Sequence, residues 1–428
     1  MTEAAMPAAL RLLLAARRKE LQDLRDLLPT CELVARLAQA IHALQKERGY
    51  SNLHLQGLAE SERAGPLPLD ERHAQSDAFL ARALQALARL ESGAGGRSAS
   101  ARLLNRAAHL CYLLEDLPRL RRRVREHGID TQQSVHAYTR LIGAMLTLVF
   151  EAADSGLDPG ITQALAALLN FMQGKELCGQ ERAEGVLGFA AGYFDADRKA
   201  RMQQLAAAQA RCFEVFCQYA DSQAAGRWRA AQAQAGDMQR LRRMIPRTSA
   251  AQPTDPALAQ VWFDVLSAHI DALHGIEAGM AAALPGLCEQ RLAQAQADLD
   301  DHRRLLARCA QESAEHGAPL LFGIQGSTLD ATSDDAAPGP RIGRSLLDLL
   351  QAQTLRLQQL DAELARARSS LDERRRLERA RRILMQRHGM DEQGAHEALQ
   401  KAAMDSGLRL EEVVARLLRE QPGAPQAG

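Results

Sequence analysis

The chain has 428 residues, of which 46% are hydrophobic, and its 53 lysines and arginines are balanced by 53 aspartates and glutamates. The length allows two or three domains. A net charge of zero excludes a global basic field that would draw the whole protein to nucleic acid or to a membrane, so any such contact must be local. Aromatic residues make up only 4% of the chain, whereas alanine and leucine are abundant, which favours helices over sheets.

Cysteines and apolar stretches narrow the class of protein further. The seven cysteines are scattered without zinc-like spacing, which predicts reduced thiols and no metal site. The apolar patch at residues 12–16 is too short for a signal-peptide core, and the most apolar stretch, residues 141–150, is too short to cross a bilayer. No GxSxG, Walker or HExxH motif is present. We therefore expect a cytoplasmic protein that is not an enzyme and has no catalytic residues, cofactor, metal or membrane contact.

The region from residue 7 to about residue 316 has the periodicity of successive amphipathic helices and no strand-like alternation. The segments are long enough for bundle helices, and the break near residue 158 gives two halves, about 1–157 and 158–316. Glycine and proline predict where the helices are interrupted, at Pro29, 65–66, 93–96, Gly128, 158–160, Gly226, 246–256 and 285–286.

Two runs, one in each half, share a Glu-Arg pair. Residues 40–52 contain Glu47-Arg48-Gly49, and residues 171–194 contain Glu181-Arg182-Ala183, 134 positions later. The second run has helical periodicity although it carries five glycines, each of which costs about 0.5–1 kcal/mol inside a helix. We therefore predict two similar bundles facing each other. We also expect the second run to form a helix, broken at most once near residues 174–179, that another backbone approaches closely.

The position of Arg182 indicates a site. It lies one turn before the glycines at positions 185, 188 and 192, so its guanidinium is predicted to point along a crevice of small residues. A guanidinium held in such a crevice needs a carboxylate or an anion beside it. The alternative is a solvated surface arginine, because only five residues of the chain are lysine and arginine is its ordinary base.

The two runs, HALQKERGYSN and FMQGKELCGQERAEGVLGFA, resemble the nitrate- and nitrite-sensing (NIT) domain of NasR-type transcription antiterminators. The resemblance implies two four-helix bundles with nitrate or nitrite bound between them by Arg48 and Arg182. It implies a third arginine in the motif 241–244, which we assign to Arg242 with Arg243 as the alternative. Planar guanidiniums suit a flat anion because they offer paired N–H donors. Glu47 and Glu181 either orient these arginines or form surface ion pairs.

The character of the sequence changes after residue 316. Residues 317–344 are rich in Gly, Ser, Asp and Pro and predict a flexible linker. Residues 345–371 carry a heptad seam, which predicts a coiled coil that pairs two protomers; the alternative is a single helix docked on the bundles. The seam consists of Leu346, Leu350, Gln353, Leu357, Leu360, Leu364, Ala367 and Leu371.

The tail, residues 372–428, predicts three short helices over about 372–388, 391–406 and 409–419, punctuated by Gly389 and Gly407. Residues 372–387 hold seven arginines against three acidic residues. A basic stripe of this kind either contacts a phosphate backbone or is a solvated helix face.

The tail resembles the ANTAR domain, the RNA-binding output module of antiterminators, through Ala380-Arg381, Leu384-Met385, Gly389-Met390, Ala395, Leu399, 403–405 and Ala415. In this chain Arg381 stands where the family usually has lysine, and His396 occupies a position that is often aromatic. The resemblance places RNA contacts at Arg379, Arg381, Arg382, Arg387, His396, Lys401 and Arg409.

Together the two resemblances imply a nitrate-responsive transcription antiterminator. Anion binding in an all-α sensor would release or pair the tails of a homodimer, formed through coiled coil and ANTAR, to hold hairpins in a leader mRNA. Two other functions remain open on the residues alone. One is a repressor or activator that binds DNA through a tail like a helix-turn-helix, with Arg409 and Arg416 near phosphates. The other is a sensor that acts only through protein contacts.

Overall fold

The computed structural model describes residues 8–57, 69–92, 100–154, 158–316, 341–390, 392–406 and 408–419. Within these ranges the chain is helical and forms no strand beyond an isolated bridge between Ser249 and Gln252. The all-α prediction is therefore confirmed. No helix in the described ranges is long and apolar enough to cross a membrane. The chain divides into two compact units, residues 1–363 and 364–428.

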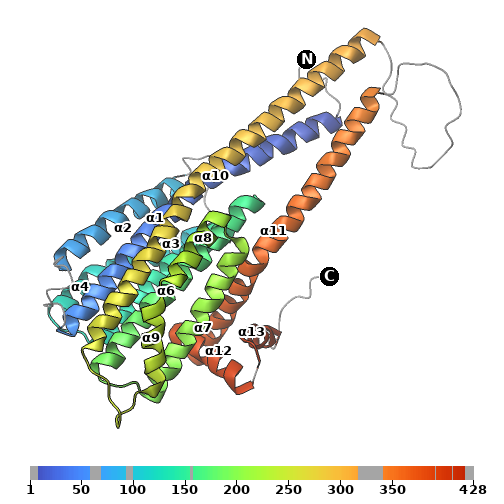
Figure 1. Cartoon of the computed structure of the whole chain (residues 1–428). Helices are drawn as coiled ribbons and strands as arrows, with labels where there is room; N and C mark the ends of the chain where they lie inside the picture. Colours follow the sequence, from blue (N-terminus) through green and yellow to red (C-terminus); the bar gives the residue numbers. More distant parts are fainter. Residues whose placement is uncertain are drawn as a thin grey trace. The chain divides into compact units, whose positions relative to one another are not determined.

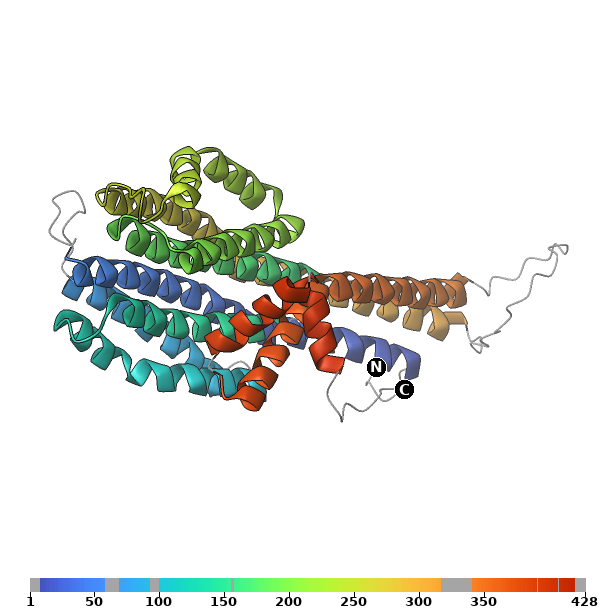
Figure 2. The same ribbon diagram turned by 90° about the horizontal axis from the view of Figure 1, so that it is seen from below.

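The first unit contains two groups of helices with the same order: two long helices, two short ones and a final long one (Figures 1 and 2). The first group is α1 (Ala8–Leu55), α2 (Leu69–Glu91), α3 (Ala101–Glu115), α4 (Leu117–Arg125) and α5 (Thr131–Asp154). The second group is α6 (Pro159–Ala190), α7 (Ala196–Tyr219), α8 (Ser222–Ala233), α9 (Gly236–Met244), a 3-10 turn (Ile245–Arg247) and α10 (Leu258–His316).

The long helices α1, α5, α6 and α10 join the two groups. The helix α10 packs against both α1 and α6, and α5 also contacts both of them. Trp262 and Phe263 of α10 lie in one apolar cluster with Phe189 of α6. A second cluster, around Phe171 and Trp228, joins α6 to α7, α8 and α10. The first members of each group therefore meet along α10, which places the two Glu-Arg motifs at the centre of the unit.

The glycines of α6 make room for side chains. The helix runs unbroken, so the break near residues 174–179 does not occur. An added Cβ at Gly185 would lie 2.0 Å from Nε1 of Trp262, and one at Gly188 would lie 2.2 Å from the ring of Phe194. Aromatic rings, and not another backbone, fill the predicted crevice at these positions.

Three predicted breaks are wrong. Pro29 lies inside α1, Gly226 inside α8 and Pro285 inside α10. Proline inside a helix removes one hydrogen bond, but tertiary packing overrides this local cost. Leu33, just beyond Pro29, is fully buried, and Cys288, just beyond Pro285, donates a hydrogen bond to the main-chain oxygen of Leu24 on α1.

The second unit contains the end of α11 (Arg341–His388), α12 (Glu392–Ser406) and α13 (Leu410–Arg419), so the three helices predicted for the tail are present. Ala380, Leu399 and Val414 form its buried centre. Gly389 follows α11 with a φ of 63°, a conformation that favours glycine at a helix end.

Much of the predicted linker and seam lies outside the described residues. Residues 317–340 are not described, and α11 begins at Arg341, before the predicted end of the linker. In the seam, Leu360 and Leu364 are half-buried. The other seam side chains lie outside the described set, so the coiled coil stays a prediction.

Two glycine substitutions test whether α6 is fitted to its aromatic neighbours. We expect Gly185→Ala to lower the free energy of unfolding by about 1–3 kcal/mol, because the methyl group would overlap the indole of Trp262. Gly143→Ala in the interior of α5, where nothing lies within 4 Å of an added Cβ, should instead raise it by up to about 1 kcal/mol. Urea denaturation followed by circular dichroism measures both. Equal effects from the two substitutions would contradict the close fit.

Candidate anion-binding site

The structure buries Arg48 of α1 and Arg182 of α6 in the interface between the two groups of helices, leaving them 1% and 6% exposed. Each guanidinium lies against a glycine of the other helix. An added Cβ at Gly49 would lie 2.3 Å from Nη2 of Arg182, and one at Gly179 would lie 2.5 Å from Nη2 of Arg48. These glycines are therefore required for the two arginines to pass between the helices.

Arg48 has its own carboxylate. Its Nη1 and Nη2 donate to the two oxygens of Glu176 on α6 at 2.6 and 3.1 Å, and Nη1 also donates to Oγ1 of Thr139 on α5 at 2.8 Å. Gln45 and Gln180 donate to the same carboxylate at 2.9 and 3.0 Å. The Nε of Arg48 is buried without a hydrogen-bond partner in the described structure. Glu176 thus neutralises Arg48 within the chain.

Arg182 has only neutral partners. Its Nη1 donates to Oγ of Ser267 on α10 at 2.7 Å and its Nη2 to the main-chain oxygen of Gln45 at 3.3 Å. Its Cζ lies 4.7 Å from the centre of the Phe263 ring. Among the described residues, no carboxylate lies within ion-pair distance of Arg182. Burial, followed by repulsion from Arg48, lowers the pKa of Arg182 to about 10.

Glu47 and Glu181 are buried and bind other arginines. The carboxylate of Glu47 accepts from Nε and Nη2 of Arg121 on α4 at 2.8 and 2.9 Å and from the hydroxyl of Tyr138 at 2.7 Å. Glu181 accepts in the same bidentate way from Arg242 on α9, with Nε at 2.6 Å. These glutamates therefore hold Arg121 and Arg242, and they are neither surface ion pairs nor the immediate partners of Arg48 and Arg182. Although burial opposes it, the glutamate contacts raise the pKa of both arginines.

The four arginines of the predicted site have different surroundings in the structure. It brings Arg48 and Arg182 together, whereas Arg242 is engaged by Glu181 and by Oε1 of Gln209 at 2.9 Å. Arg243 is exposed, and its Nε donates to the main-chain oxygen of Gln239 on its own helix. Arg242 therefore lies with Glu181 and Gln209, and among the described residues no hydrogen bond joins it to Arg48 or Arg182.

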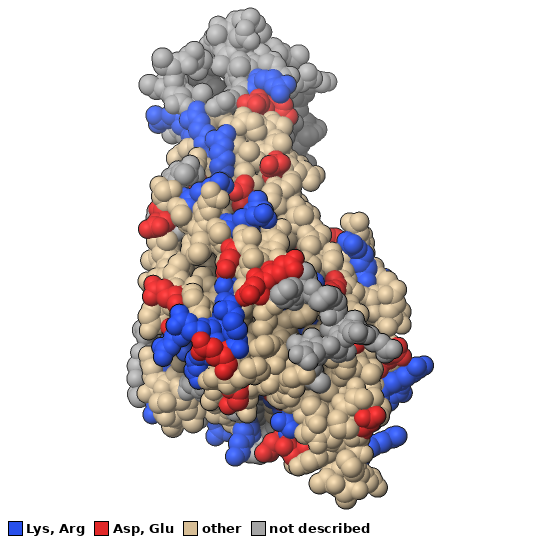
Figure 3. Space-filling model, turned by 90° about the vertical axis from the view of Figure 1, so that its left-hand side faces the viewer, with Lys and Arg blue, Asp and Glu red and all other residues tan. Residues whose placement is uncertain are grey.

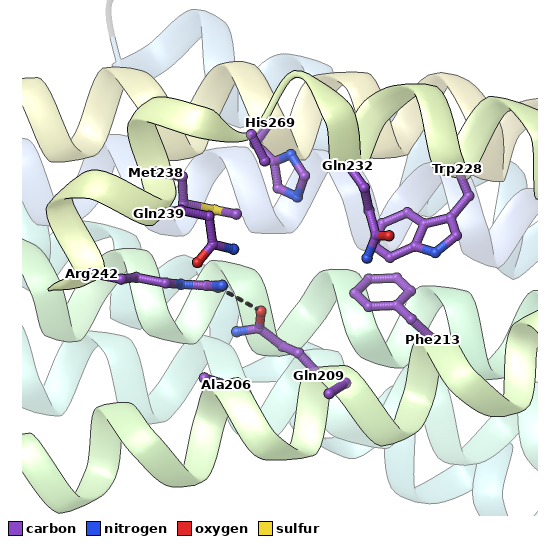
Figure 4. A pocket seen from close by; sticks show the side chains of 11 residues that line it. Ala206, Gln209, Phe213, Trp228, Gln232, Met238, Gln239, Arg242 and His269 are labelled. Carbon is purple, nitrogen blue, oxygen red and sulfur yellow. Dashed lines mark hydrogen bonds between the residues drawn. The ribbon is translucent and has the colours of Figure 1, made fainter.

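A cavity of about 390 Å³ lies beside Arg242 between α7, α8, α9 and α10. Figure 4 shows Arg242 pointing toward Gln209 along one side, with Phe213, Trp228 and His269 around the rest. Burial and the charge of Arg242 lower the pKa of His269 to about 4, so the imidazole of His269 is neutral at pH 7. The volume suits organic ligands of roughly 300–1,000 Å³ and is far larger than a four-atom anion needs. We therefore place the candidate anion site at Arg48 and Arg182.

The charges around Arg182 are otherwise paired, whether buried or partly exposed. Lys175 donates to Glu277 at 2.7 Å with both side chains fully buried, and Lys46 lies 3.0 Å from Asp271. With Arg48 bound to Glu176, each of these three cations has a carboxylate. We give the name central layer to the described charged residues where α1, α6 and α10 meet. In this layer Arg182 is left as one surplus positive charge. The arrangement can accept one monoanion.

Three residues that define this pairing were not predicted from the sequence. Glu176 and Ser267 contact the two central arginines, and Arg121 binds Glu47. A usable signal existed for Glu176, since it lies six residues before Arg182 within the same run. Nothing comparable identified Ser267, whose contact depends on how α10 is rotated. The described residues contain no group of histidine, cysteine, aspartate and glutamate that could hold a metal ion.

In the second unit the predicted RNA-contacting residues fall into two sets. Arg381 and His396 are half-buried and lie together, with Nη2 of Arg381 2.9 Å from Nδ1 of His396; Arg381 also pairs with Glu378 at 3.0 Å. The remaining five are exposed on the helices and at the start of α13: Arg379, Arg382, Arg387, Lys401 and Arg409. On the face drawn in Figure 3, blue and red side chains are interspersed, as expected for a chain of zero net charge.

The fold and site define the class of protein: a helical sensor with a buried surplus guanidinium, followed in the same chain by a small helical unit with exposed cations. The family described as nitrate and nitrite sensing (NIT) matches residues 39–284, and the ANTAR domain matches residues 365–418. The chain belongs to the NIT family and carries an ANTAR domain.

Two relatives match the chain over nearly all of its length. The nitrate regulatory protein of Klebsiella oxytoca is 32% identical over 409 residues, which cover 94% of this chain and 93% of that protein. The solved structure of the NasR transcription antiterminator is similar with a TM-score of 0.59 and 29% identity, covering 94% of this chain and 97% of the other.

The neutral histidine beside the site predicts acid sensitivity. Burial, followed by the charge of Lys175, keeps the pKa of His42 far below its usual value of 6.5. Below about pH 6.5 the unfolded chain takes up a proton at this residue and the folded chain does not. We therefore expect the free energy of unfolding to decrease as the pH is lowered, with His42 contributing up to about 1.4 kcal/mol per pH unit. Urea titrations between pH 7.5 and 5 measure this slope, and His42→Gln should reduce it; an unchanged slope would contradict the assignment.

Proposed function

We propose that this protein is a nitrate-responsive transcription antitermination regulator in which an anion bound at the interface of the two helical groups controls the ANTAR domain. The observation that carries the proposal is Arg182, a buried guanidinium that contacts a hydroxyl, a carbonyl and an aromatic ring but no carboxylate. An uncompensated charge in such a place is costly. An external anion removes that cost, so the folded state and the ligand are linked.

Nitrate fits the chemistry of the site. It is a small planar monoanion, and a guanidinium offers coplanar N–H donors to such a group. Its single charge equals the surplus of the layer that contains Arg182. Nitrite has the same charge and the same type of acceptor oxygens, so it is expected to bind as well.

Binding changes the balance of forces among three helices. Without an anion, Arg182 is buried beside the positive charge of Arg48, and burial followed by this repulsion lowers the pKa of Arg182. An anion beside Arg182 replaces repulsion between α1 and α6 by attraction, and Ser267 brings α10 into the same contact. Since a ligand shifts a conformational equilibrium by its difference in affinity, the ligand favours a tighter arrangement of the three helices. The helix α10 continues to His316 and leads toward α11.

The output is binding of RNA by the ANTAR domain. Exposed cations on this unit, among them Arg379, Arg382 and Arg387, are the type of side chain that contacts phosphates. We propose that the tightened sensor releases or pairs two such domains through α11, so that a homodimer holds paired hairpins of a leader mRNA. Holding them keeps a terminator hairpin from forming, and transcription continues into nitrate-assimilation genes.

Isothermal titration with nitrate, nitrite, chloride and sulfate tests the sensor. Wild-type protein should bind nitrate and nitrite. Arg182→Ala should weaken nitrate binding at least about 100-fold, because it removes two or more charge-assisted hydrogen bonds of about 1.5–3 kcal/mol each. Arg243→Ala, which removes an exposed arginine of α9, is the matched control and should leave the affinity within about twofold. Normal nitrate binding by Arg182→Ala would remove that arginine from the site.

Arg48→Ala should also abolish the nitrate response, although for a different reason. The substitution frees the buried carboxylate of Glu176, which then competes with nitrate for Arg182.

Titration of a two-hairpin leader RNA, with and without saturating nitrate, tests the output. We expect nitrate to raise RNA affinity at least about tenfold, and Arg379→Ala with Arg382→Ala to weaken binding and lower its salt dependence by about one counterion per lost contact. Duplex DNA at matched salt is the comparison. RNA affinity that is indifferent to nitrate would exclude the switch, and preference for duplex DNA would favour a DNA-binding regulator.

A further inference from the structure

The two halves of the sensor are chemical repeats as well as structural ones. The shared order of helices relates α1 to α6, α4 to α9 and α5 to α10. In each half the glutamate of the Glu-Arg motif binds an arginine of the second short helix, Arg121 on α4 or Arg242 on α9. The repeat therefore extends from the backbone to the buried ion pairs.

The motif arginines follow the same rule. Nη1 of Arg48 donates to a hydroxyl of α5, that of Thr139, at 2.8 Å. Nη1 of Arg182 donates to a hydroxyl of α10, that of Ser267, at 2.7 Å. Because α5 and α10 are the equivalent last helices of the two halves, these hydroxyls occupy corresponding places. The region around each motif arginine can accordingly be called a half-site, the first at Arg48 and the second at Arg182.

One position breaks this symmetry. Glu176, the carboxylate of the first half-site, precedes Arg182 by six positions on α6. The residue that precedes Arg48 by the same number of positions on α1 is His42. The offset of 134 positions that relates Arg48 to Arg182 also relates His42 to Glu176. A histidine therefore stands where the repeat would place the carboxylate of the second half-site.

This histidine does not supply charge of either sign. Its ring stacks on that of His274 with centres 3.5 Å apart, and it is 8% exposed. Burial, followed by the charges around it, including Lys175 and Arg182, keeps it in the neutral form at pH 7. Its Nδ1 is buried with no hydrogen-bond partner in the described part of the structure. The second half-site thus has an uncompensated guanidinium and a polar ring atom without a partner.

The groups that face His42 from neighbouring helices account for the remaining charge. Lys46 pairs with Asp271, which lies 3.9 Å from Nε2 of His42. Lys175 and His274 both adjoin Glu277, at 2.7 and 3.8 Å. The carboxylates of α10 are thereby shared with other cations and histidines, and none of them is within ion-pair distance of Arg182.

We propose that the second half-site binds a single monoanion, held by Arg182 and the hydroxyl of Ser267, which supplies for Arg182 the negative charge that Glu176 supplies for Arg48. The inference rests on the proposed function and specifies its geometry. Ser267 accepts from Arg182 through its oxygen, which leaves its own O–H to donate to the anion. Glu176 is a built-in anion for Arg48, so each chain takes up one external anion and not two.

The test exchanges the carboxylates between the half-sites and counts bound nitrate by isothermal titration of the full-length protein. Wild type should bind one nitrate per chain. His42→Glu supplies a carboxylate beside Arg182 and should abolish nitrate binding. Glu176→Gln removes the carboxylate from Arg48 with little change of shape and should raise the stoichiometry to two. Helicity measured by circular dichroism shows whether each variant is folded.

A milder pair of variants keeps the inference falsifiable if a charge exchange prevents folding. Ser267→Ala should weaken nitrate binding about tenfold or more, through loss of a hydrogen bond to an anion, and Thr139→Ala should cost distinctly less. Equal losses, or a larger loss from Thr139→Ala, would overturn the assignment, as would one normal nitrate bound by folded His42→Glu.

The outcomes also separate this inference from the broader proposal. Absence of nitrate binding by wild type would overturn both. Nitrate binding by wild type that depends on Arg182 but is indifferent to His42→Glu and Ser267→Ala would leave the nitrate sensor standing and overturn the single-seat arrangement alone.

Discussion

The structure depends on one uncompensated charge. Arg182 sits in the contact between α1, α6 and α10, and the neighbouring cations Arg48, Lys46 and Lys175 each have a carboxylate in the described structure. Burying a charge is tolerable when a partner is near and costly when none is. By neutralising Arg48, Lys46 and Lys175 internally, the chain confines this cost to one position. A ligand that supplies the missing charge therefore acts at that position and on the three helices that meet there.

The helix α10 is the element best placed to respond. Five residues at successive turns of α10 contact Arg182 or its neighbours. Phe263 and Ser267 contact the guanidinium of Arg182, Asp271 pairs with Lys46, His274 stacks on His42, and Glu277 binds Lys175. One face of α10 therefore contacts Arg182, Lys46, His42 and Lys175. A change in the force between Arg182 and its surroundings is transmitted to α10 directly, without an intervening loop. The same helix carries Trp262, whose Nε1 donates to the main-chain oxygen of Arg182 at 3.0 Å, so α10 holds both ends of that residue.

The sequence predicted what is repeated and local, and it failed on what depends on helix rotation. The helical class followed from periodicity, and the two runs that the structure brings together stood out by their shared Glu-Arg pair and by their resemblance to one family. The partners did not follow. Glu47 and Glu181 stand next to the motif arginines in sequence, but side chains one position apart on a helix point about 100° apart, so these glutamates face Arg121 and Arg242 on other helices. Pro29 and Pro285 were read as breaks because local propensity favours them, yet buried neighbours hold both helices continuous.

The charge of the layer also bears on which anions the site selects. One surplus positive charge is matched by nitrate or nitrite, whereas a dianion such as sulfate would leave a buried negative charge in place of a positive one, at comparable cost. Chloride has the correct charge but is a single atom, so it cannot bridge the guanidinium and the hydroxyl of Ser267 through separate oxygens along fixed directions. If the proposed site is correct, its preference for a small planar monoanion follows from charge count and donor direction together.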